Sequence, residues 1–136
     1  MSDNNKTTGE TTEPAFNLDG RFFRPLVIGP EGPVAGETLF YYRQQDDLVW
    51  GTYGGGAIRH GTLVARMAGN GMLDMRYQHL EDSGALKTGR AQSVPERLPD
   101  GRIRLSEYWQ WTCGNLEQGR SVIEEVPAPG EHKLLL

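Results

Sequence analysis

The chain has 136 residues, with 14 basic and 18 acidic side chains and a formal net charge of −4, so neither a nucleic-acid backbone nor an anionic membrane is an expected partner. It contains no apolar run near the roughly 18 residues that span a bilayer, no signal-peptide core and a single cysteine, Cys113, which excludes an intramolecular disulfide and a thiolate metal cluster. These features predict one soluble domain, of bacterial type and located in the cytoplasm.

The two ends of the chain differ in composition from its centre. Residues 1–15 are polar and lack apolar periodicity, which predicts a disordered tail because they cannot bury enough surface to offset the entropy of ordering. Residues 16–127 are predicted to form the folded domain and residues 128–136 a C-terminal tail. Within the domain, residues 29–36 contain two prolines and three glycines, so they are predicted to be a loop.

Short β-favouring segments alternate with turn signals over the rest of the domain. Residues 16–18 and 21–24 flank a tight turn at Asp19-Gly20, and residues 69–71 (Gly-Asn-Gly) are the strongest hairpin signal in the chain. Further strands are predicted at residues 38–44, 48–53, 58–67, 72–80, 86–94, 102–112 and 120–126.

These spacings predict an all-β fold. Strands recur about every 10 to 14 residues with short connections, which indicates an antiparallel meander. About eight such strands favour a closed up-and-down β-barrel of the calycin-like type, because closure removes exposed edges; a two-sheet sandwich is the alternative. An eight-strand barrel has an interior just large enough for side chains or for one small ligand.

Residues 102–112 define a reference face for the other strands. Glu107 is the exception on this face, because a buried carboxylate needs a partner or a raised pKa. Alternation places the following residues together on the apolar face: Ile103, Leu105, Glu107, Trp109 and Trp111.

Alternation on three further strands adds polar candidates to the predicted interior. On residues 72–80, Tyr77 and His79 point inward. On residues 86–94 and 120–126 the inward face is ambiguous. If the set with Arg90 and the set with Glu125 point inward, the interior gathers a polar cluster inside an aromatic wall, made of Tyr77, His79, Arg90, Glu107, Trp109 and Glu125.

Two interpretations of this cluster stay open. In the first, Glu107 pairs with Arg90, or hydrogen-bonds Tyr77 or His79, and the network sets only the strand register. In the second, these groups orient a small polar or amphipathic ligand, since binding pockets combine apolar walls with a few polar groups. The candidate ligand-binding residues are Tyr53, Tyr77, His79, Arg90, Glu107, Trp109 and Trp111.

Two other functions are consistent with the same residues. A structural or interaction module with a closed core would act through an exposed patch of Tyr41, Tyr42 and Tyr108, or as a homodimer. An enzyme would use Glu107 with His79 as acid and base. No nucleophile with a partner base is evident, so no catalytic residue is assigned and a non-catalytic ligand-binding barrel is the preferred prediction.

Motifs for metals and cofactors are weak in this sequence. The three histidines show no metal-ligand spacing, so no metal is expected. Residues 66–71 match R-x-x-G-x-G, the loop by which acetyltransferases cradle the acetyl-CoA pyrophosphate, but a strand pattern follows where that loop requires a helix. The hairpin turn accounts for these glycines, and no cofactor is expected.

Several segments together resemble small, uncharacterised bacterial all-β proteins that often carry the automatic label N-acetylglutamate synthase. The label implies acetyl transfer, which GCN5-type enzymes support with helices around a mixed sheet, whereas this pattern leaves no room for helices. The chain is also similar to calycins, the lipocalins and their relatives, which implies small-molecule binding. The segments that carry the resemblance include residues 23–25, 36–38, 53–55, 74–77, 101–105, 107–112 and 124–125.

Overall fold

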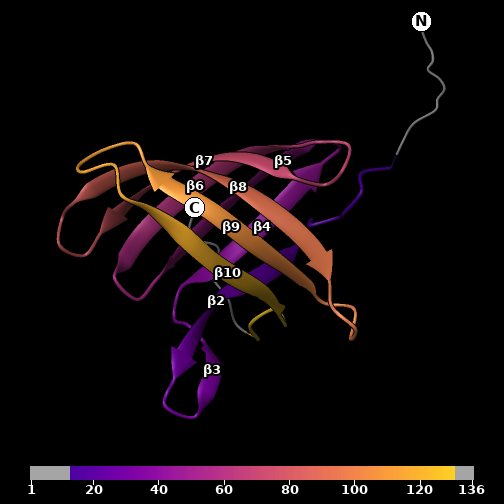
Figure 1. Cartoon of the computed structure of the whole chain (residues 1–136), viewed down its shortest axis with the longest axis horizontal. Coiled ribbons are helices and arrows are strands. Elements are labelled where there is room, and N and C mark those ends of the chain that lie inside the picture. Colours follow the sequence, from indigo (N-terminus) through magenta and orange to yellow (C-terminus); the bar gives the residue numbers. More distant parts are fainter. Residues whose placement is uncertain (1–12, 131–136) are drawn as a thin grey trace, which may run out of the picture.

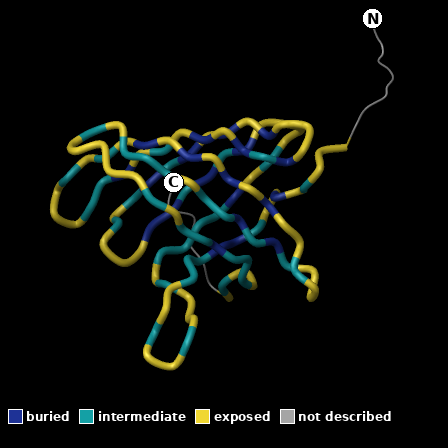
Figure 2. Tube along the Cα trace, in the orientation of Figure 1, coloured by how far each residue is buried: buried dark blue, intermediate teal, exposed yellow. Residues whose placement is uncertain are grey.

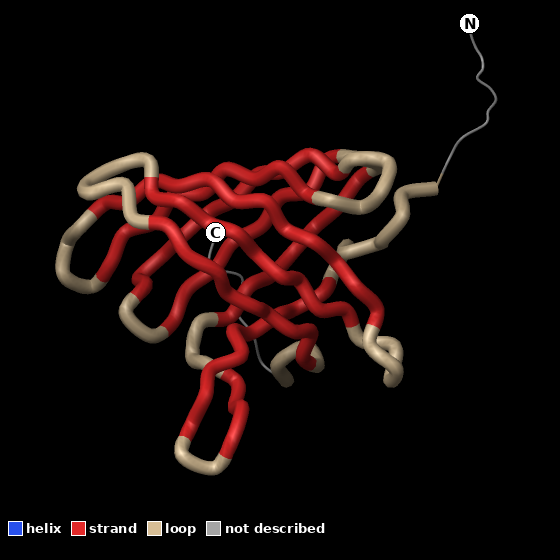
Figure 3. Tube along the Cα trace, viewed as in Figure 1, coloured by secondary structure: helices blue, strands red, loops and turns tan. Residues whose placement is uncertain are grey.

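The computed structural model describes residues 13–130, and all regular structure in this range is β-strand (Figure 3). The all-β prediction is therefore confirmed, whereas the tails predicted over residues 1–15 and 128–136 lie largely outside the described residues. Residues 13–130 contain no helix long and apolar enough to cross a membrane. The strands are β2 (Arg21–Gly29), β3 (Gly32–Ala35), β4 (Leu39–Gln45), β5 (Leu48–Gly55), β6 (Ile58–Met67), β7 (Leu73–Glu81), β8 (Leu86–Arg97), β9 (Ile103–Trp111) and β10 (Gln118–Val126).

The strands form one closed antiparallel barrel (Figure 1). Each strand from β4 to β9 pairs with the next strand along the chain, and β2 pairs with both β4 and β10. The ladder between β10 and β2 runs from Ile123 opposite Pro25 to Val126 opposite Phe22, and it closes a barrel of eight strands. The predicted up-and-down barrel is confirmed and the two-sheet sandwich is wrong, because every barrel strand pairs on both sides.

The prediction of a loop at residues 29–36 is wrong. β2 continues to Gly29 and pairs with β3, so this segment is a hairpin that projects from the barrel (Figure 1). Pro33 lies opposite Ile28, and β3 pairs on one side only, so the missing proline N–H breaks no second ladder. Figure 2 shows that the hairpin is largely exposed, and it therefore adds little to the core.

One end of the barrel is packed shut by the segment before β2. The predicted turn at Asp19-Gly20 is confirmed, with Gly20 at a φ of 77° and the Arg21 N–H donating to the Leu18 carbonyl at 3.2 Å. This turn directs Leu18 into the barrel, where its N–H donates to Gln44 Oε1 at 2.8 Å. The fully buried residues packed at this closed end include Leu18, Phe23, Leu73, Ile103 and Leu105.

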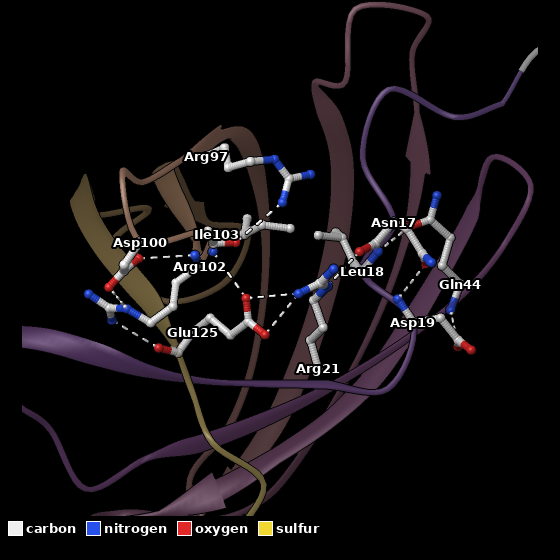
Figure 4. A network of polar contacts seen from close by, with 11 residues as sticks. Asn17, Leu18, Asp19, Arg21, Gln44, Arg97, Asp100, Arg102, Ile103 and Glu125 are labelled. Carbon is white, nitrogen blue, oxygen red and sulfur yellow. Dashed lines mark hydrogen bonds and ion pairs between the residues drawn. The ribbon is translucent and has the colours of Figure 1, made fainter.

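A partly buried ion pair joins three strands at the closed end (Figure 4). Arg21 Nη1 donates to the two carboxylate oxygens of Glu125 at 3.0 and 2.9 Å. The Ile103 N–H donates to the same carboxylate at 3.0 Å. Glu125 therefore belongs to the inward-facing residues of β10. It lies at the closed end, however, and is not part of a cluster with Glu107 and His79.

Truncation of the plugging side chain is expected to destabilise the barrel. Leu18→Ala should lower the free energy of unfolding by about 2 to 5 kcal/mol, because it leaves a cavity among fully buried side chains. Urea denaturation measures this change. The matched control is Ile28→Ala, at a position that is 81% exposed, and it should stay within about 0.5 kcal/mol of the natural chain. Equal losses in the two variants would contradict the plug.

Candidate functional site

A cavity of about 410 Å³ occupies the opposite, open end of the barrel. Ala57 and Glu81, at the ends of the β5–β6 and β7–β8 connections, lie at its rim, and β4, β5, β6, β7, β9 and β10 supply its walls. Small-ligand pockets typically measure roughly 300 to 1,000 Å³. The barrel interior is therefore filled at one end and hollow at the other.

Aromatic rings form most of the cavity wall, and they contact one another. Phe40 stacks on Tyr53 with ring centroids 4.9 Å apart. Trp111 lies at the centre of a second group, 5.7 Å from Tyr77 and 5.5 Å from His79, with the ring planes steeply inclined. Such edge-to-face contacts restrict how the rings can turn. The aromatic lining residues are Phe40, Tyr42, Tyr53, Tyr77, Trp109 and Trp111.

Cross-strand glycines keep three of these rings flat against the wall. Each ring lies directly opposite a glycine on the neighbouring strand, and a Cβ atom at that glycine would overlap the ring. A larger residue there would push the ring into the hollow interior. The open cavity therefore depends on these pairs, which are Tyr53 with Gly61, Tyr77 with Gly89, and Trp109 with Gly119.

Glu107 lies where the packed core ends and the cavity begins. On its face of β9, Leu105 is fully buried on one side and Trp109 lines the cavity on the other. The Ser93 hydroxyl donates to Glu107 Oε2 at 3.3 Å. Burial raises the pKa of Glu107 to about 7, and the nearby hydroxyls of Ser93 and Tyr42 only partly offset this rise. Glu107 is therefore a carboxyl group that changes charge near neutral pH.

Tyr42 brings a second hydroxyl to the Glu107 carboxyl group. Its side chain is fully buried, and its hydroxyl lies against the Glu107 carboxyl group, whose pKa it lowers; within residues 13–130 no group donates to the hydroxyl oxygen. Burial, followed by the charge of Glu107, holds the pKa of Tyr42 well above its usual value. The floor of the cavity therefore has hydrogen-bonding capacity that the barrel itself does not use.

His79 belongs to a separate series of polar contacts along the cavity wall. Its Nδ1 lies 3.0 Å from the Tyr53 hydroxyl, and its Nε2 lies 3.1 Å from Glu81 Oε2. Lys87 Nζ lies 3.2 Å from the same Glu81 oxygen. The hydrogen bond from His79 is the main reason that the pKa of Glu81 is lowered, whereas burial raises that of Tyr53. These contacts hold the cavity wall in place between Tyr53 and the rim.

The structure places most of the predicted site residues around the cavity. Arg90 is the exception: it is exposed on the outer face of β8 and donates to Gln110 Oε1 at 3.0 Å. Glu107 accordingly hydrogen-bonds Ser93 and not Arg90. No group of His, Cys, Asp and Glu within residues 13–130 could hold a metal ion. The predicted residues that line the cavity are Tyr53, Tyr77, His79, Glu107, Trp109 and Trp111.

Side-chain size explains why β8 turns Arg90 outward. From Gly89 to Ser93 its inward residues are small, and each lies between larger inward residues on β7 and β9: Ala91, for example, is opposite both Met75 and Trp109. Large side chains on both neighbouring strands leave space only for small ones between them. The run of Gly89, Ala91 and Ser93 was the available signal against Arg90.

Two lining residues of β4 were missed from the sequence. Phe40 and Tyr42 point into the barrel, and the prediction of Tyr42 in an exposed patch with Tyr41 and Tyr108 is wrong because Tyr42 is fully buried. Aromatic residues occupy both faces of this strand, so alternation cannot identify its inward face. Ser121, directly opposite Glu107, also lines the cavity without a distinguishing pattern.

Comparison with models of protein families matches most of this chain. The model described as "Avidin-like protein" matches residues 16–126, a range that contains every strand of the barrel. No curated protein and no solved structure matches the chain.

The facing glycines are expected to be essential to the shape of the wall. Gly89→Ala should lower the free energy of unfolding by about 1 to 3 kcal/mol, because the new methyl group overlaps the Tyr77 ring. Urea denaturation provides the measurement. The control is Gly69→Ala, where a methyl group meets nothing within 4 Å, and it should change stability by less than about 0.5 kcal/mol. A neutral Gly89→Ala variant would show that the ring does not depend on the glycine.

Glu107 is expected to make the barrel less stable as pH rises. Its pKa is about 7 in the folded protein and 4.5 ordinarily, so the folded state holds this proton more tightly than the unfolded state does. The stabilisation that the protonated Glu107 gives the folded state is fully present below about pH 4.5, and it is lost as pH rises through 7. Between pH 5 and pH 8 the natural chain should lose roughly 2 to 3 kcal/mol relative to Glu107→Gln in urea denaturation. Parallel pH profiles for the two proteins would refute the assignment.

Proposed function

The chain belongs to the avidin-like protein family, and we propose that it is a non-catalytic barrel that binds one small, partly polar ligand in the cavity at its open end. Membership of this family supports a ligand-binding barrel. The observation that carries the proposal is the cavity itself, which combines a volume of about 410 Å³ with an aromatic wall and a polar floor.

The polar groups of the floor support binding more than packing. A residue pair that only fixed strand register would be expected to satisfy its own hydrogen bonds. Glu107 and Tyr42 meet at the floor, where the Tyr42 hydroxyl oxygen lacks a donor within residues 13–130. A ligand with an N–H or O–H group at this point would supply the donor that the Tyr42 oxygen lacks.

The contacts of His79 favour binding over catalysis. An acid–base mechanism would use Glu107 and His79 on one substrate atom, within about 3 Å of each. His79 uses both ring nitrogens in the wall, on Tyr53 and Glu81, so neither nitrogen is free to face Glu107. We therefore assign His79 a positioning role for Tyr53 and no catalytic residue to the site.

A second candidate function is an interaction module that acts through the outside of the barrel, including as a homodimer. A hollow of about 570 Å³ lies on the outer face of β7 to β10. Arg90 and the exposed Tyr108 line it, together with Arg120, whose guanidinium lies 5.3 Å from the centre of the Tyr108 ring. Tyrosine and arginine are residue types that are enriched at protein interfaces.

A ligand in the cavity is expected to stabilise the folded protein. At 100 times its dissociation constant it should add about 2.7 kcal/mol, which raises Tm by roughly 10 °C in a domain of this size. Thermal unfolding would be followed with small molecules of different charge, including glutamate, N-acetylglutamate, acetyl-CoA and biotin, the last an example of what avidin-like proteins bind.

A pair of variants on β10 locates the effect. Ser121→Leu places a larger side chain in the cavity and should abolish the ligand-induced rise in Tm. Val122→Leu adds bulk at the next residue, which points out of the barrel, and should leave that rise unchanged. A uniformly flat response of the natural chain would reject the proposed function and favour the interaction module.

A further inference from the structure

The charged groups of the cavity are unbalanced. Its lining includes two carboxyl side chains, Glu107 at the floor and Glu81 at the rim, and no lysine or arginine is among the lining residues. Glu81 is already matched, since it contacts both Lys87 and His79. Within residues 13–130, the groups that hydrogen-bond Glu107 are neutral, the hydroxyls of Ser93 and Tyr42. Glu107 is therefore the unmatched negative group of the site whenever it is ionised.

The hydrogen-bonding capacity of the floor favours a ligand that donates. A carboxylate accepts through about four lone-pair positions, and the hydroxyls of Ser93, at 3.3 Å, and Tyr42 leave some of them unused in Glu107. The Tyr42 hydroxyl oxygen is also without a donor within residues 13–130. A ligand with N–H groups would fill both acceptors, whereas a ligand carboxylate would face Glu107 as a like charge.

The aromatic wall favours a cation over a neutral donor. An ammonium group is attracted to a ring face within about 6 Å of its centre. Lys87 Nζ lies 5.1 Å from the centre of the Trp111 ring, so this wall already contacts one ammonium at its rim. The Trp109 ring lies next to the Trp111 ring, with their centroids 5.9 Å apart. It extends the aromatic surface toward Glu107, which precedes Trp109 by two residues in β9.

We propose that the cavity selects an organic ammonium ion, a primary or secondary amine whose N–H groups bond Glu107 and Tyr42 and whose carbon groups lie among the aromatic rings. This inference rests on the proposed ligand-binding function and specifies its ligand class. Ligands whose polar end is a carboxylate are excluded from the floor by the charge of Glu107. Binding of the cation requires the ionised carboxylate, so Glu107 releases its proton as the amine binds.

The pH dependence of amine binding should come from Glu107. The other titratable groups that face it are Tyr42 on β4, Tyr53 on β5 and Tyr77 on β7, and burial raises the pKa of each, to about 12 for Tyr77, so all three are neutral below pH 8. His79 and Glu81 lie further along the wall and pair with each other. Amine affinity should therefore rise about tenfold from pH 6 to pH 8, as the ionised fraction of Glu107 rises.

Three probes of similar shape test the charge preference: phenethylamine as the cation, phenethyl alcohol as the neutral compound and phenylacetate as the anion. Dissociation constants would be measured at pH 6 and pH 8 by quenching of tryptophan fluorescence, with calorimetry as a second readout. At pH 8 the amine should bind at least tenfold more tightly than the alcohol, and phenylacetate should not bind.

Two variants test whether the preference for a cation comes from Glu107 and Tyr42 at the floor of the cavity. Glu107→Gln should weaken amine binding at least tenfold and remove its pH dependence, and it should weaken binding of the alcohol by a smaller factor. Tyr42→Phe keeps the ring and should weaken amine binding about threefold to tenfold. If the alcohol equals the amine at pH 8, or affinity does not rise with pH, the ammonium assignment is wrong and the ligand-binding function stands. If none of the three probes binds, the ammonium assignment is wrong, and the thermal-unfolding screen decides separately whether the cavity binds another small molecule.

Discussion

The ladder between β10 and β2 is the contact on which the rest of the structure depends. Without it the strands would form an open meander with two exposed edges, whereas with it their inward faces enclose a single space. Arg21 and Glu125 bridge the same two strands although they are 104 residues apart in the chain. A contact over this separation carries a large loop-closure entropy, so the hairpins between β4 and β10 must bring the two strands together.

The two ends of the barrel differ because the side chains on one continuous wall differ in size. At the closed end, large aliphatic residues and the plug at Leu18 fill the interior. At the open end, rings that could fill the same space lie flat over facing glycines such as Gly89 and Gly119. Glu107 lies at the boundary, where it is buried enough for its pKa to rise but still borders the cavity. This position makes Glu107 the point of recognition in the proposed site.

Much of the fold could be predicted from local patterns, and particular residues show where those patterns end. Alternation on residues 102–112 placed Glu107 on the inward face, because a period of two belongs to a single strand. The same rule could not decide for Arg90, since both faces of β8 carry polar and small residues. It also failed for Tyr42, because β4 has aromatic residues on both faces. Proline and glycine at residues 29–36 concealed a hairpin that has a free edge.

By itself the sequence determined the all-β class, the strand positions and the inward face of β9, since each depends on residues close together in the chain. Only the tertiary structure decided that Arg90 lies outside, that Glu125 pairs with Arg21 at the far end, and that Tyr42 meets Glu107. These outcomes depend on register and side-chain size across strands distant in sequence. For the same reason, the open cavity results from rings and glycines that become neighbours only when the barrel forms.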